Sequence, residues 1–333
     1  MQIVQNYIDQ IKNGTTPVCE HVRNAVARYE KDIADGWKFS EQLAAHAVEF
    51  IENLEHTTGD YAGRAFKLEP WQAFIVWNLF GFLNEDGSRR FTRAYIEVPR
   101  KNGKSTFSSA IMLYGLIADD EPAAQVYSAA TKLDQAMMVF GESVRVCQNL
   151  PWLNEALTVN NSVNNRRIVY GQSIYKPLEW NPNKQDGLNT HMACIDEYHA
   201  HPNDELYNVI RNSMGARKQP LLFTITTAGF NREAPCYKHR QYCASVLNGA
   251  IKDDALFSVI YTLDEGDDWT DPDVWQKANP NWGVSVYPRQ LQQALTEAKE
   301  FVHKEVEFKT KLLNVWTDTA QTWISDSMWK QCD

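Results

Sequence analysis

The order of apolar and polar positions along the chain predicts an α/β protein. Runs rich in β-branched and aromatic residues, which are typical of strands, occupy residues 94–98, 125–130, 191–197, 220–228 and 256–263. Apolar positions at helical spacing lie between several of these runs, notably over residues 70–82, 107–117 and 132–147. Because strands that alternate with helices form parallel sheets, we expect a mainly parallel central sheet flanked by helices.

Three further segments depart from this alternation. Residues 1–60 are helical in pattern, with Ser40 as a candidate N-cap, and we interpret them as a helical N-terminal addition. Residues 158–178 predict a short antiparallel group of strands with Asn-rich turns, after a break at Pro151. Over residues 289–316 the sequence predicts one long, charged amphipathic helix.

Composition narrows the class of protein. Of the 333 residues, 44% are hydrophobic, 23% charged and 12% aromatic, which predicts a soluble globular chain. No apolar run approaches the ~20 residues of a membrane span, and the N-terminus does not resemble a signal peptide. The six cysteines form no C-x-x-C pair, which favours reduced thiols in a cytoplasmic compartment. With a net charge of −9, any contact with nucleic acid must use a local basic face.

The candidate chemistry begins at the loop that follows the first strand of the core. Gly103, Lys104 and Ser105 match the end of the P-loop motif, in which backbone amides and a helix N-terminus face phosphate groups. Lys104 would contact the β- and γ-phosphates of ATP, and Ser105 would bind Mg²⁺. Val98 stands where the motif has its first glycine, so a basic surface turn is the alternative. The candidate nucleotide-binding set is Gln72, Arg100, Lys101, Asn102, Gly103, Lys104, Ser105 and Thr106.

Polar residues also follow the ends of two later strands. Asp196 would hold Mg²⁺ through its water shell, and Glu197 would deprotonate the attacking water. Thr226 and Thr227 end another strand and would sense the γ-phosphate. Upstream, the side-chain amide of Gln72 can pair with the edge of adenine, although for this residue alone a solvated helix start is the simpler interpretation. Strand ends that converge on one crevice are typical of ligand sites in open α/β sheets.

Two other groups of residues are open to more than one interpretation. A set of possible metal ligands surrounds the Asp-Glu pair, namely His191, His199, His201 and Asp204. It lacks a third well-spaced ligand, so we favour loop histidines over a metal cluster. A basic stretch precedes the P-loop and is either a face for phosphates and DNA or a solvated turn; it contains Arg89, Arg90 and Arg93.

Taken together, these motifs resemble the ATPase domain of the terminase large subunit of tailed double-stranded-DNA phages. The segments that carry the resemblance are residues 68–72, 100–105, 195–197, 224–229, 277–281 and 313–316. A missing first glycine in the P-loop is also typical of that family. The resemblance implies a RecA-like P-loop ATPase core over residues 61–265, followed by a helical lid and linker subdomain over residues 266–333.

The resemblance further implies ATP hydrolysis that drives viral DNA into a procapsid, with ATP and Mg²⁺ as cofactors. The implied partners are double-stranded DNA, the portal protein, the small terminase subunit and further copies of the chain in a pentameric ring, in the host cytoplasm. Arg100 would contact the γ-phosphate in cis, and a neighbour in the ring would supply a second cation. Asp186-Gly187 stands where many family members have Arg-Gly, so the candidates for that residue are Arg217, Arg211 and Lys184, in that order.

The resemblance also bears on DNA cleavage. Full-length family members continue into a metal-dependent nuclease domain, and this sequence stops about where that domain would begin. We therefore expect no nuclease domain and no DNA cleavage. The late acids Asp318, Asp326 and Asp333 are not expected to form a catalytic set.

Three alternatives to a packaging ATPase remain. A two-lobed helicase shares these motifs, but the ~100 residues after Gly229 are too few for a second lobe. A metal-dependent nuclease would use Asp196, Glu197, His199 and His201. A non-catalytic portal-binding or DNA-binding module with a degenerate P-loop would bind ATP without turnover.

Overall fold

One sheet of eight strands organises the chain in the computed structural model, which describes residues 2–179 and 187–318. The strands are β1 Arg93–Glu97, β2 Gln125–Ala130, β3 Thr158–Ser162, β4 Asn165–Tyr170, β5 Ser173–Glu179, β6 Met192–Asp196, β7 Leu221–Thr226 and β8 Leu256–Ile260. Their order in space is β3-β4-β5-β2-β6-β7-β1-β8. From β5 to β8 every neighbouring pair is parallel. The predicted α/β fold with a mainly parallel sheet is confirmed.

The predicted antiparallel group forms, and it extends the main sheet. β3 pairs with β4 and β4 pairs with β5 in antiparallel register, and β5 then pairs with β2 in parallel. Every residue of β6, β7 and β8 is buried, which explains their continuous apolar sequences, because helices cover both faces of a parallel sheet.

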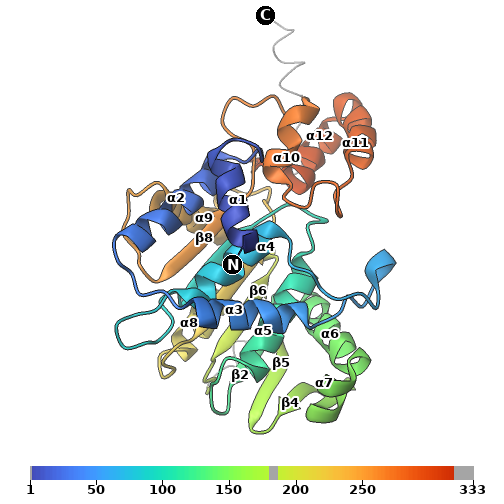
Figure 1. Ribbon diagram of the computed structural model, residues 1–333. Coiled ribbons are helices and arrows are strands. Elements are labelled where there is room, and N and C mark those ends of the chain that lie inside the picture. The colour runs from blue at the N-terminus through green and yellow to red at the C-terminus, as the bar shows by residue number, and fades with distance from the viewer. Residues whose placement is uncertain (1, 180–186, 319–333) are drawn as a thin grey trace, which may run out of the picture.

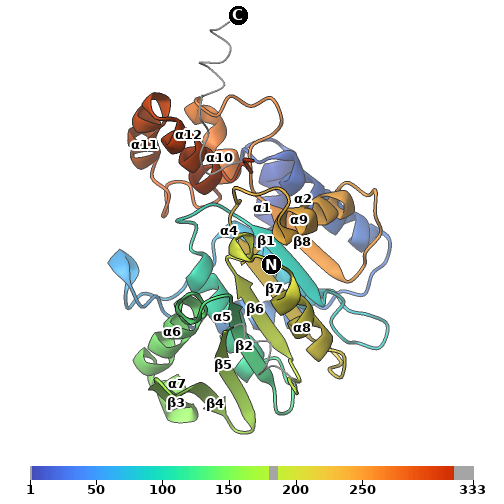
Figure 2. The ribbon, with the colours of Figure 1, turned by 180° about the vertical axis from the view of Figure 1, so that it is seen from behind.

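Helices cover both faces of this sheet. Their bounds are α1 Gln2–Lys12, α2 Glu20–Ala34, α3 Glu41–Glu52, α4 Pro70–Gly81, α5 Lys104–Ile117, α6 Leu133–Asn149, α7 Pro151–Ala156, α8 Glu205–Ser213 and α9 Pro235–Leu247, with short 3₁₀ turns η1 Gly59–Tyr61 and η2 Tyr198–Ala200. α3, α4 and α5 lie in front of the sheet in Figure 1, whereas α8 and α9 lie in front of it in Figure 2. The break predicted at Pro151 is confirmed, since α6 ends at Asn149 and Leu150 is extended; a second helix then starts at Pro151, because proline suits the first turn, where its missing N–H is not needed.

The N-terminal helices share the core of the sheet. α1 packs on α4, and α2 packs on β8 and α9, so that α2 covers the edge strand β8. The hydroxyl groups of Tyr7 and Tyr261 lie 2.9 Å apart, and Arg28 donates to the carbonyl oxygen of Leu256 at 2.7 Å. The predicted N-terminal addition is therefore built into the same hydrophobic core, where it protects an exposed strand edge.

Ser40 caps α3 as predicted, since its Oγ accepts a hydrogen bond from the backbone N–H of Leu43 at 3.2 Å. We expect Ser40→Ala to lower the free energy of unfolding by about 1 kcal/mol, because one N–H of the first turn loses its partner. Urea denaturation of the chain measures this loss. Ser40→Asn retains a capping oxygen and should be close to neutral, so an equal loss in both variants would contradict the assignment.

The last helices form a second, smaller unit. α10 Trp275–Ala278, α11 Pro288–Glu300, α12 Val302–Glu307 and the π-helical turn η4 Phe308–Leu312 lie together beyond one edge of the sheet (Figure 1). Their apolar side chains make a separate cluster of Trp275, Val286, Leu291, Leu295, Ala298, Phe308 and Leu313. We call residues 266–318 the C-terminal helical subdomain; the division of the whole chain into three parts remains a prediction.

The single long helix predicted over residues 289–316 is wrong. The backbone leaves the helical region at Phe301, where φ is −126° and ψ is 121°, and α12 then packs against α11. This break lets both helices bury their apolar sides in the cluster around Trp275, which one straight helix could not do. The sequence also predicts that the chain ends in a compact tail around Trp323 and Trp329, and both residues lie outside the described part of the chain. Within the described ranges, none of the helices has the length and apolar character needed to cross a bilayer.

Candidate active site

The register of three adjacent strands brings the predicted motifs together. β7 lies between β6 and β1, with Glu97 opposite Thr226 and Asp196 opposite Ile225. Because these strands are parallel, the loops that follow them meet at the same edge of the sheet. The P-loop, the Asp-Glu pair and the two threonines therefore converge, as the sequence predicted.

The backbone of the P-loop explains why valine is tolerated at position 98. The N–H of Val98 donates to the carbonyl oxygen of Thr226 at 3.0 Å, so this residue prolongs β1 and needs no left-handed conformation. The left-handed positions of the loop are instead Lys101, with φ of 70°, and Gly103, with φ of 74°. Gly103 is the N-cap of α5, where its backbone conformation suits a residue without a side chain.

The side chain of Lys104 lies inside this loop. Its ammonium donates to the carbonyl oxygens of Val98 and Pro99 at 3.3 and 3.1 Å. Burial lowers the pKa of Lys104, an effect that the carboxylates of Asp196 and Glu197 oppose. The loop thus holds a buried cation at the N-terminus of α5. This cation and the free backbone N–H groups of the helix end together form an anion-binding arrangement.

The two acids at the end of β6 are held in different states. Burial beside Glu197 raises the pKa of Asp196 to about 7. Burial also acts to raise the pKa of Glu197, but His199 and the charge of Lys104 outweigh it and lower that pKa to about 2. Glu197 has left-handed backbone angles, φ 51° and ψ 43°, a strained conformation of the kind found at functional sites.

Asp196 and Ser105 supply hard oxygen ligands of the kind that Mg²⁺ prefers. The residues present therefore fit Mg²⁺. In the described ranges, no group of three or more His, Cys, Asp or Glu side chains could hold a metal ion by itself.

The three histidines near β6 have separate environments. His191 immediately precedes β6, at the end of the strand away from Asp196, and its Nε2 lies 2.7 Å from Oδ2 of Asp119. His201 is buried against the ring of Tyr198. His191 and His201 are therefore buried, although both lie outside helices and strands. His199 belongs to the site, because its Nδ1 lies 3.0 Å from Oε2 of Glu197.

Both threonines at the end of β7 are buried and contact His199. Oγ1 of Thr226 accepts a hydrogen bond from the backbone N–H of His199 at 3.0 Å, and it lies 3.1 Å from the ring Nδ1. Oγ1 of Thr227 lies 3.4 Å from the same ring nitrogen. His199 is therefore a shared neighbour of both threonine hydroxyl groups.

Lys311 is a site residue that the sequence did not single out. It comes from η4 in the C-terminal helical subdomain, and its Nζ lies 2.9 Å from Nε2 of His199. Burial lowers the pKa of Lys311 to about 8. A lysine in a highly charged stretch of helix gives no sign of burial, so only the tertiary structure places it here.

Glu97 is a second residue missed from the sequence. Its side chain is fully buried at the end of β1 and accepts hydrogen bonds from Tyr95, Arg240, Asn314 and Trp316 at 2.5 to 3.3 Å. Asn314 and Trp316 belong to the segment that follows η4. Glu97 therefore connects the strand before the P-loop to the C-terminal helical subdomain.

Two residues predicted to bind nucleotide have other partners. The side chain of Asn102 is buried; it donates to Oδ1 of Asn279 at 3.1 Å and accepts from the N–H of Asn281 at 3.0 Å. Asn102 thus fastens the P-loop to the C-terminal helical subdomain, and only its backbone remains for phosphate. Gln72 belongs to the capping box at the start of α4, where its Oε1 accepts a hydrogen bond from the backbone N–H of the N-cap residue Glu69 at 3.0 Å. This bond uses the oxygen of the side-chain amide and leaves its NH₂ group for the predicted contact with adenine.

The candidates for the trans-acting cation differ in their exposure. Arg217 donates to the carboxylate of Glu121 at 2.8 Å. It also donates to backbone carbonyl oxygens in the segments that precede β2 and β6, at the edge of the sheet opposite the P-loop; these belong to Pro122, Ala123 and Asn189. This guanidinium is therefore engaged within its own chain, and the assignment of Arg217 as the trans-acting cation remains a prediction. Arg211 is exposed at the end of α8, and Lys184 lies outside the described residues.

The basic stretch before the P-loop is not a DNA-binding face. Arg89 pairs with Asp119, Arg90 with Asp32 at 2.8 Å, and Arg93 with Asp253 at 2.7 Å. The guanidinium of Arg90 also lies 3.6 Å from the ring centre of Trp37. These cations pair with acids inside the fold, which fits neither a face for phosphates and DNA nor a solvated turn.

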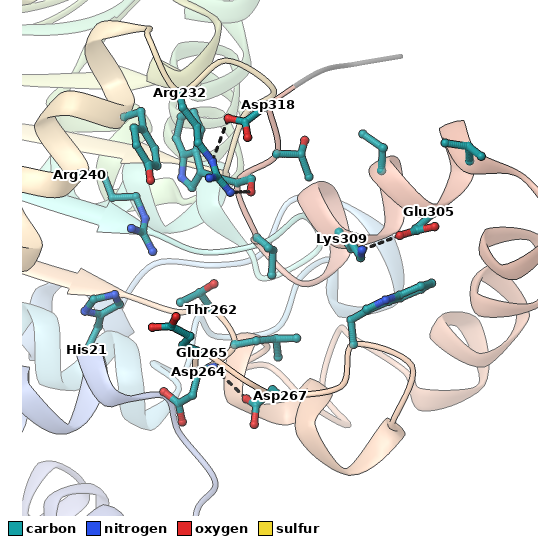
Figure 3. Close-up of a pocket in the computed structure, with 18 residues that line it drawn as sticks. His21, Arg232, Arg240, Thr262, Asp264, Glu265, Asp267, Glu305, Lys309 and Asp318 are labelled. Atoms are coloured by element: carbon teal, nitrogen blue, oxygen red, sulfur yellow. Dashed lines mark hydrogen bonds and ion pairs between the residues drawn. The ribbon is translucent and has the colours of Figure 1, made fainter. Parts of the chain in front are cut away.

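A cleft of about 700 Å³ separates the sheet from the C-terminal helical subdomain (Figure 3). Arg240 and Trp316, two partners of Glu97, line this cleft, and Lys309 and Glu305 face it from the other side. Arg232 pairs there with Asp318 at 3.2 Å. The cleft is lined by residues of both charge signs, and its lining includes neither the P-loop nor the Asp-Glu pair.

Comparisons with known proteins agree with this geometry. The model of the family "Terminase large subunit, ATPase domain" matches residues 70–245, and that of "Terminase large subunit, endonuclease domain" matches residues 250–333. The terminase large subunit of Enterobacteria phage HK97 is 24% identical over 279 residues, which are 82% of this chain and 53% of that protein. Protein YmfN of Escherichia coli (strain K12) is 48% identical over 148 residues, 44% of this chain and 32% of that protein.

Two solved structures share the fold. The crystal structure of the HK97 large terminase superimposes with a TM-score of 0.71 at 22% identity, over 87% of this chain and 58% of that one. A variant of the large-terminase ATPase domain of Thermus phage P74-26 gives a TM-score of 0.50 at 17% identity, over 68% and 90%. The predicted RecA-like ATPase fold is thereby confirmed. This chain spans about half of the HK97 protein.

The comparisons correct one expectation. The match of the endonuclease-domain model to residues 250–333 overturns the prediction that no nuclease domain is present. The expectation that the chain cleaves no DNA therefore loses its support. In the structure, the matched segment begins just before β8 and includes the C-terminal helical subdomain.

Proposed function

We propose, from the premise that this chain belongs to the terminase large subunit family, that it hydrolyses ATP to drive double-stranded viral DNA into a procapsid. The observation that supports the ATPase activity is that the P-loop, which follows β1, and the pair Asp196 and Glu197, at the end of β6, lie at the same edge of the sheet. Only β7 lies between these two strands. A cation at a helix N-terminus next to the buried Asp196 and the partly exposed Glu197 is suited to binding and hydrolysing a phosphate anhydride.

Each residue of the site has a role in this proposal. The backbone amides of the P-loop and the ammonium of Lys104 bind the β- and γ-phosphates, and Arg100, which is exposed on the loop, contacts the γ-phosphate. Ser105 and Asp196 hold Mg²⁺, which when bound offsets the negative charge of the phosphates. Glu197, kept ionised by its lowered pKa, orients the attacking water and accepts its proton.

The partners follow from the family and extend the proposal. They are double-stranded DNA, the portal protein, the small terminase subunit and copies of this chain in a pentameric ring in the host cytoplasm. Arg211 is now the first candidate for the cation that one copy donates to its neighbour, because it is exposed while Arg217 is engaged. DNA contacts must come from basic residues other than the three internal arginines before the P-loop.

Steady-state ATP hydrolysis, measured across a range of protein concentrations, tests the proposal. Turnover that rises more than linearly with concentration is expected if a neighbouring copy completes the site. Nucleotide binding without turnover at any concentration would favour a non-catalytic module or a need for other packaging components. A complete lack of nucleotide binding would contradict the P-loop assignment.

Lys104→Ala tests the same site at the level of binding. Hydrogen bonds to charged groups contribute about 1.5–3 kcal/mol, so we expect affinity for ATP to fall roughly 10–100-fold. Titration with a fluorescent ATP analogue measures the change. Lys299→Ala, at an exposed position of α11, is the matched control and should leave affinity unchanged. Equal affinities of the Lys104 variant and the unmodified chain would argue against a phosphate contact.

A further inference from the structure

The side chain of Lys311 leaves its own subdomain and ends among three acceptors of the ATPase core. Its Nζ lies 2.9 Å from Nε2 of His199, 3.1 Å from the carbonyl oxygen of Ala228 and 3.4 Å from Oγ1 of Thr227. An ammonium group has three N–H donors and no acceptor, so these three atoms match its full hydrogen-bonding capacity. Lys311 is buried, which leaves little access for competing water.

This arrangement determines which nitrogen of His199 carries the proton. Because Lys311 can only donate, Nε2 of His199 must accept, and the ring proton must be on Nδ1. Burial lowers the pKa of His199 and thereby favours the neutral ring, which has one such proton. The position of the proton on the ring is thus dictated by a residue of another subdomain.

The protonated nitrogen faces the proposed catalytic base. Nδ1 of His199 lies at ion-pair distance, 3.0 Å, from Oε2 of Glu197, a buried oxygen that has no hydrogen-bond partner among the described residues. The other neighbour, Oγ1 of Thr226, already accepts from the backbone N–H of His199 and donates to the carbonyl oxygen of Thr227. Because a hydroxyl oxygen can accept two hydrogen bonds, Nδ1–H can donate to Oγ1 of Thr226, while Oε2 of Glu197 lies beside it at ion-pair distance and is attracted by the positive end of this N–H.

The same lysine is also tied to the P-loop through its backbone. The N–H of Arg100 donates to the carbonyl oxygen of Lys311 at 3.0 Å. The P-loop residue Asn102 is fastened to the same subdomain through Asn279 and Asn281. One unit of the fold therefore contacts both the phosphate-binding loop and the partner of the base.

We propose that Lys311 is a positioning residue of the ATPase site: it fixes the tautomer of His199, which in turn orients Glu197 toward the attacking water. ATP hydrolysis then requires the C-terminal helical subdomain to be docked on the core. This inference rests on the proposed ATPase function and deepens it, because it assigns control of the base to a subdomain that lies outside the sheet.

Three variants of the full chain test this role by kinetics. Lys311→Met removes the ammonium but keeps a side chain of similar length, and it should lower kcat roughly 10–100-fold while the affinity for ATP stays within about twofold. Lys311→Arg keeps a buried donor and should recover part of the loss. Lys309→Met is the matched control, because Lys309 lies in the same turn but faces the cleft and pairs with Glu305. An unchanged kcat in Lys311→Met would overturn the proposal.

A spectroscopic measurement tests the contact without relying on hydrolysis. In the chain labelled with ¹⁵N-histidine, the ring of His199 should show the Nδ1-protonated tautomer, with the signal assigned by its loss in His199→Gln. In Lys311→Met we expect a shift toward the other tautomer, and an unchanged spectrum would overturn the proposal. If the unmodified chain hydrolyses no ATP, the proposed function fails, while the tautomer still decides whether Lys311 controls His199.

Discussion

Replacement of Glu197 by glutamine is expected to lower ATP turnover about 10²–10⁴-fold, which is the usual contribution of a general base. Glutamine has nearly the same shape, but it cannot accept the proton of the attacking water. Because Glu197 approaches the P-loop from β6 and is no part of it, nucleotide binding should persist. Single-turnover hydrolysis together with a nucleotide-binding titration measures the two effects separately.

The matched control for this variant is Glu155→Gln on α7, at an exposed position outside the site. It makes the same chemical change and should leave turnover unaltered. If Glu197→Gln retained full turnover, the base would have to be another residue. If it lost nucleotide binding as well, the left-handed backbone at Glu197 would have a structural role in the site rather than a catalytic one.

Glu97→Ala is expected to lower the free energy of unfolding by about 3–5 kcal/mol, because it removes one partner of a buried ion pair. Arg240 loses the carboxylate that it contacts at 3.2 Å, and Trp316 loses the acceptor of its indole N–H at 3.2 Å. Both partners lie at the junction between the sheet and the chain that follows η4. Urea denaturation, followed by tryptophan fluorescence, measures the loss.

Glu97→Gln separates charge from hydrogen bonding at the same position. Its amide oxygen can still accept a hydrogen bond, so the loss should be smaller than in Glu97→Ala. Glu300→Ala, at an exposed position of α11, controls for the loss of a surface carboxylate and should be close to neutral. If Glu97→Ala lowered the free energy of unfolding by less than about 1 kcal/mol, the effect would be that of an ordinary surface substitution. That result would contradict the role of Glu97 as a buried connection.

The contacts around the site connect the two units of the chain at three points. Glu97 binds the segment after η4, Asn102 binds the loop after α10, and Lys311 reaches the end of β7. Each contact joins the C-terminal helical subdomain to a loop or strand end that we assign to ATP hydrolysis. A movement of the nucleotide-binding residues would therefore reach this subdomain through these polar contacts rather than through the separate apolar cluster around Trp275.

The sequence by itself determined the sheet and the local motifs. Strands that are buried on both faces are apolar throughout, so β6, β7 and β8 were visible as continuous runs. The P-loop and the Asp-Glu pair were visible because their chemistry depends on neighbours in sequence. Since parallel strands end at one edge, the convergence of these motifs followed from the alternation of strands and helices.

Only the tertiary structure decided what the charged residues do. Arg90 and Asp32, Glu97 and Trp316, and Lys311 and His199 are far apart in sequence, and a charge that finds a distant partner looks like any solvated charge in the sequence. The break at Phe301 likewise depends on packing around Trp275, since helical periodicity continues through it. Local patterns reveal structure with local causes, whereas the burial and pairing of a charge are properties of the folded chain.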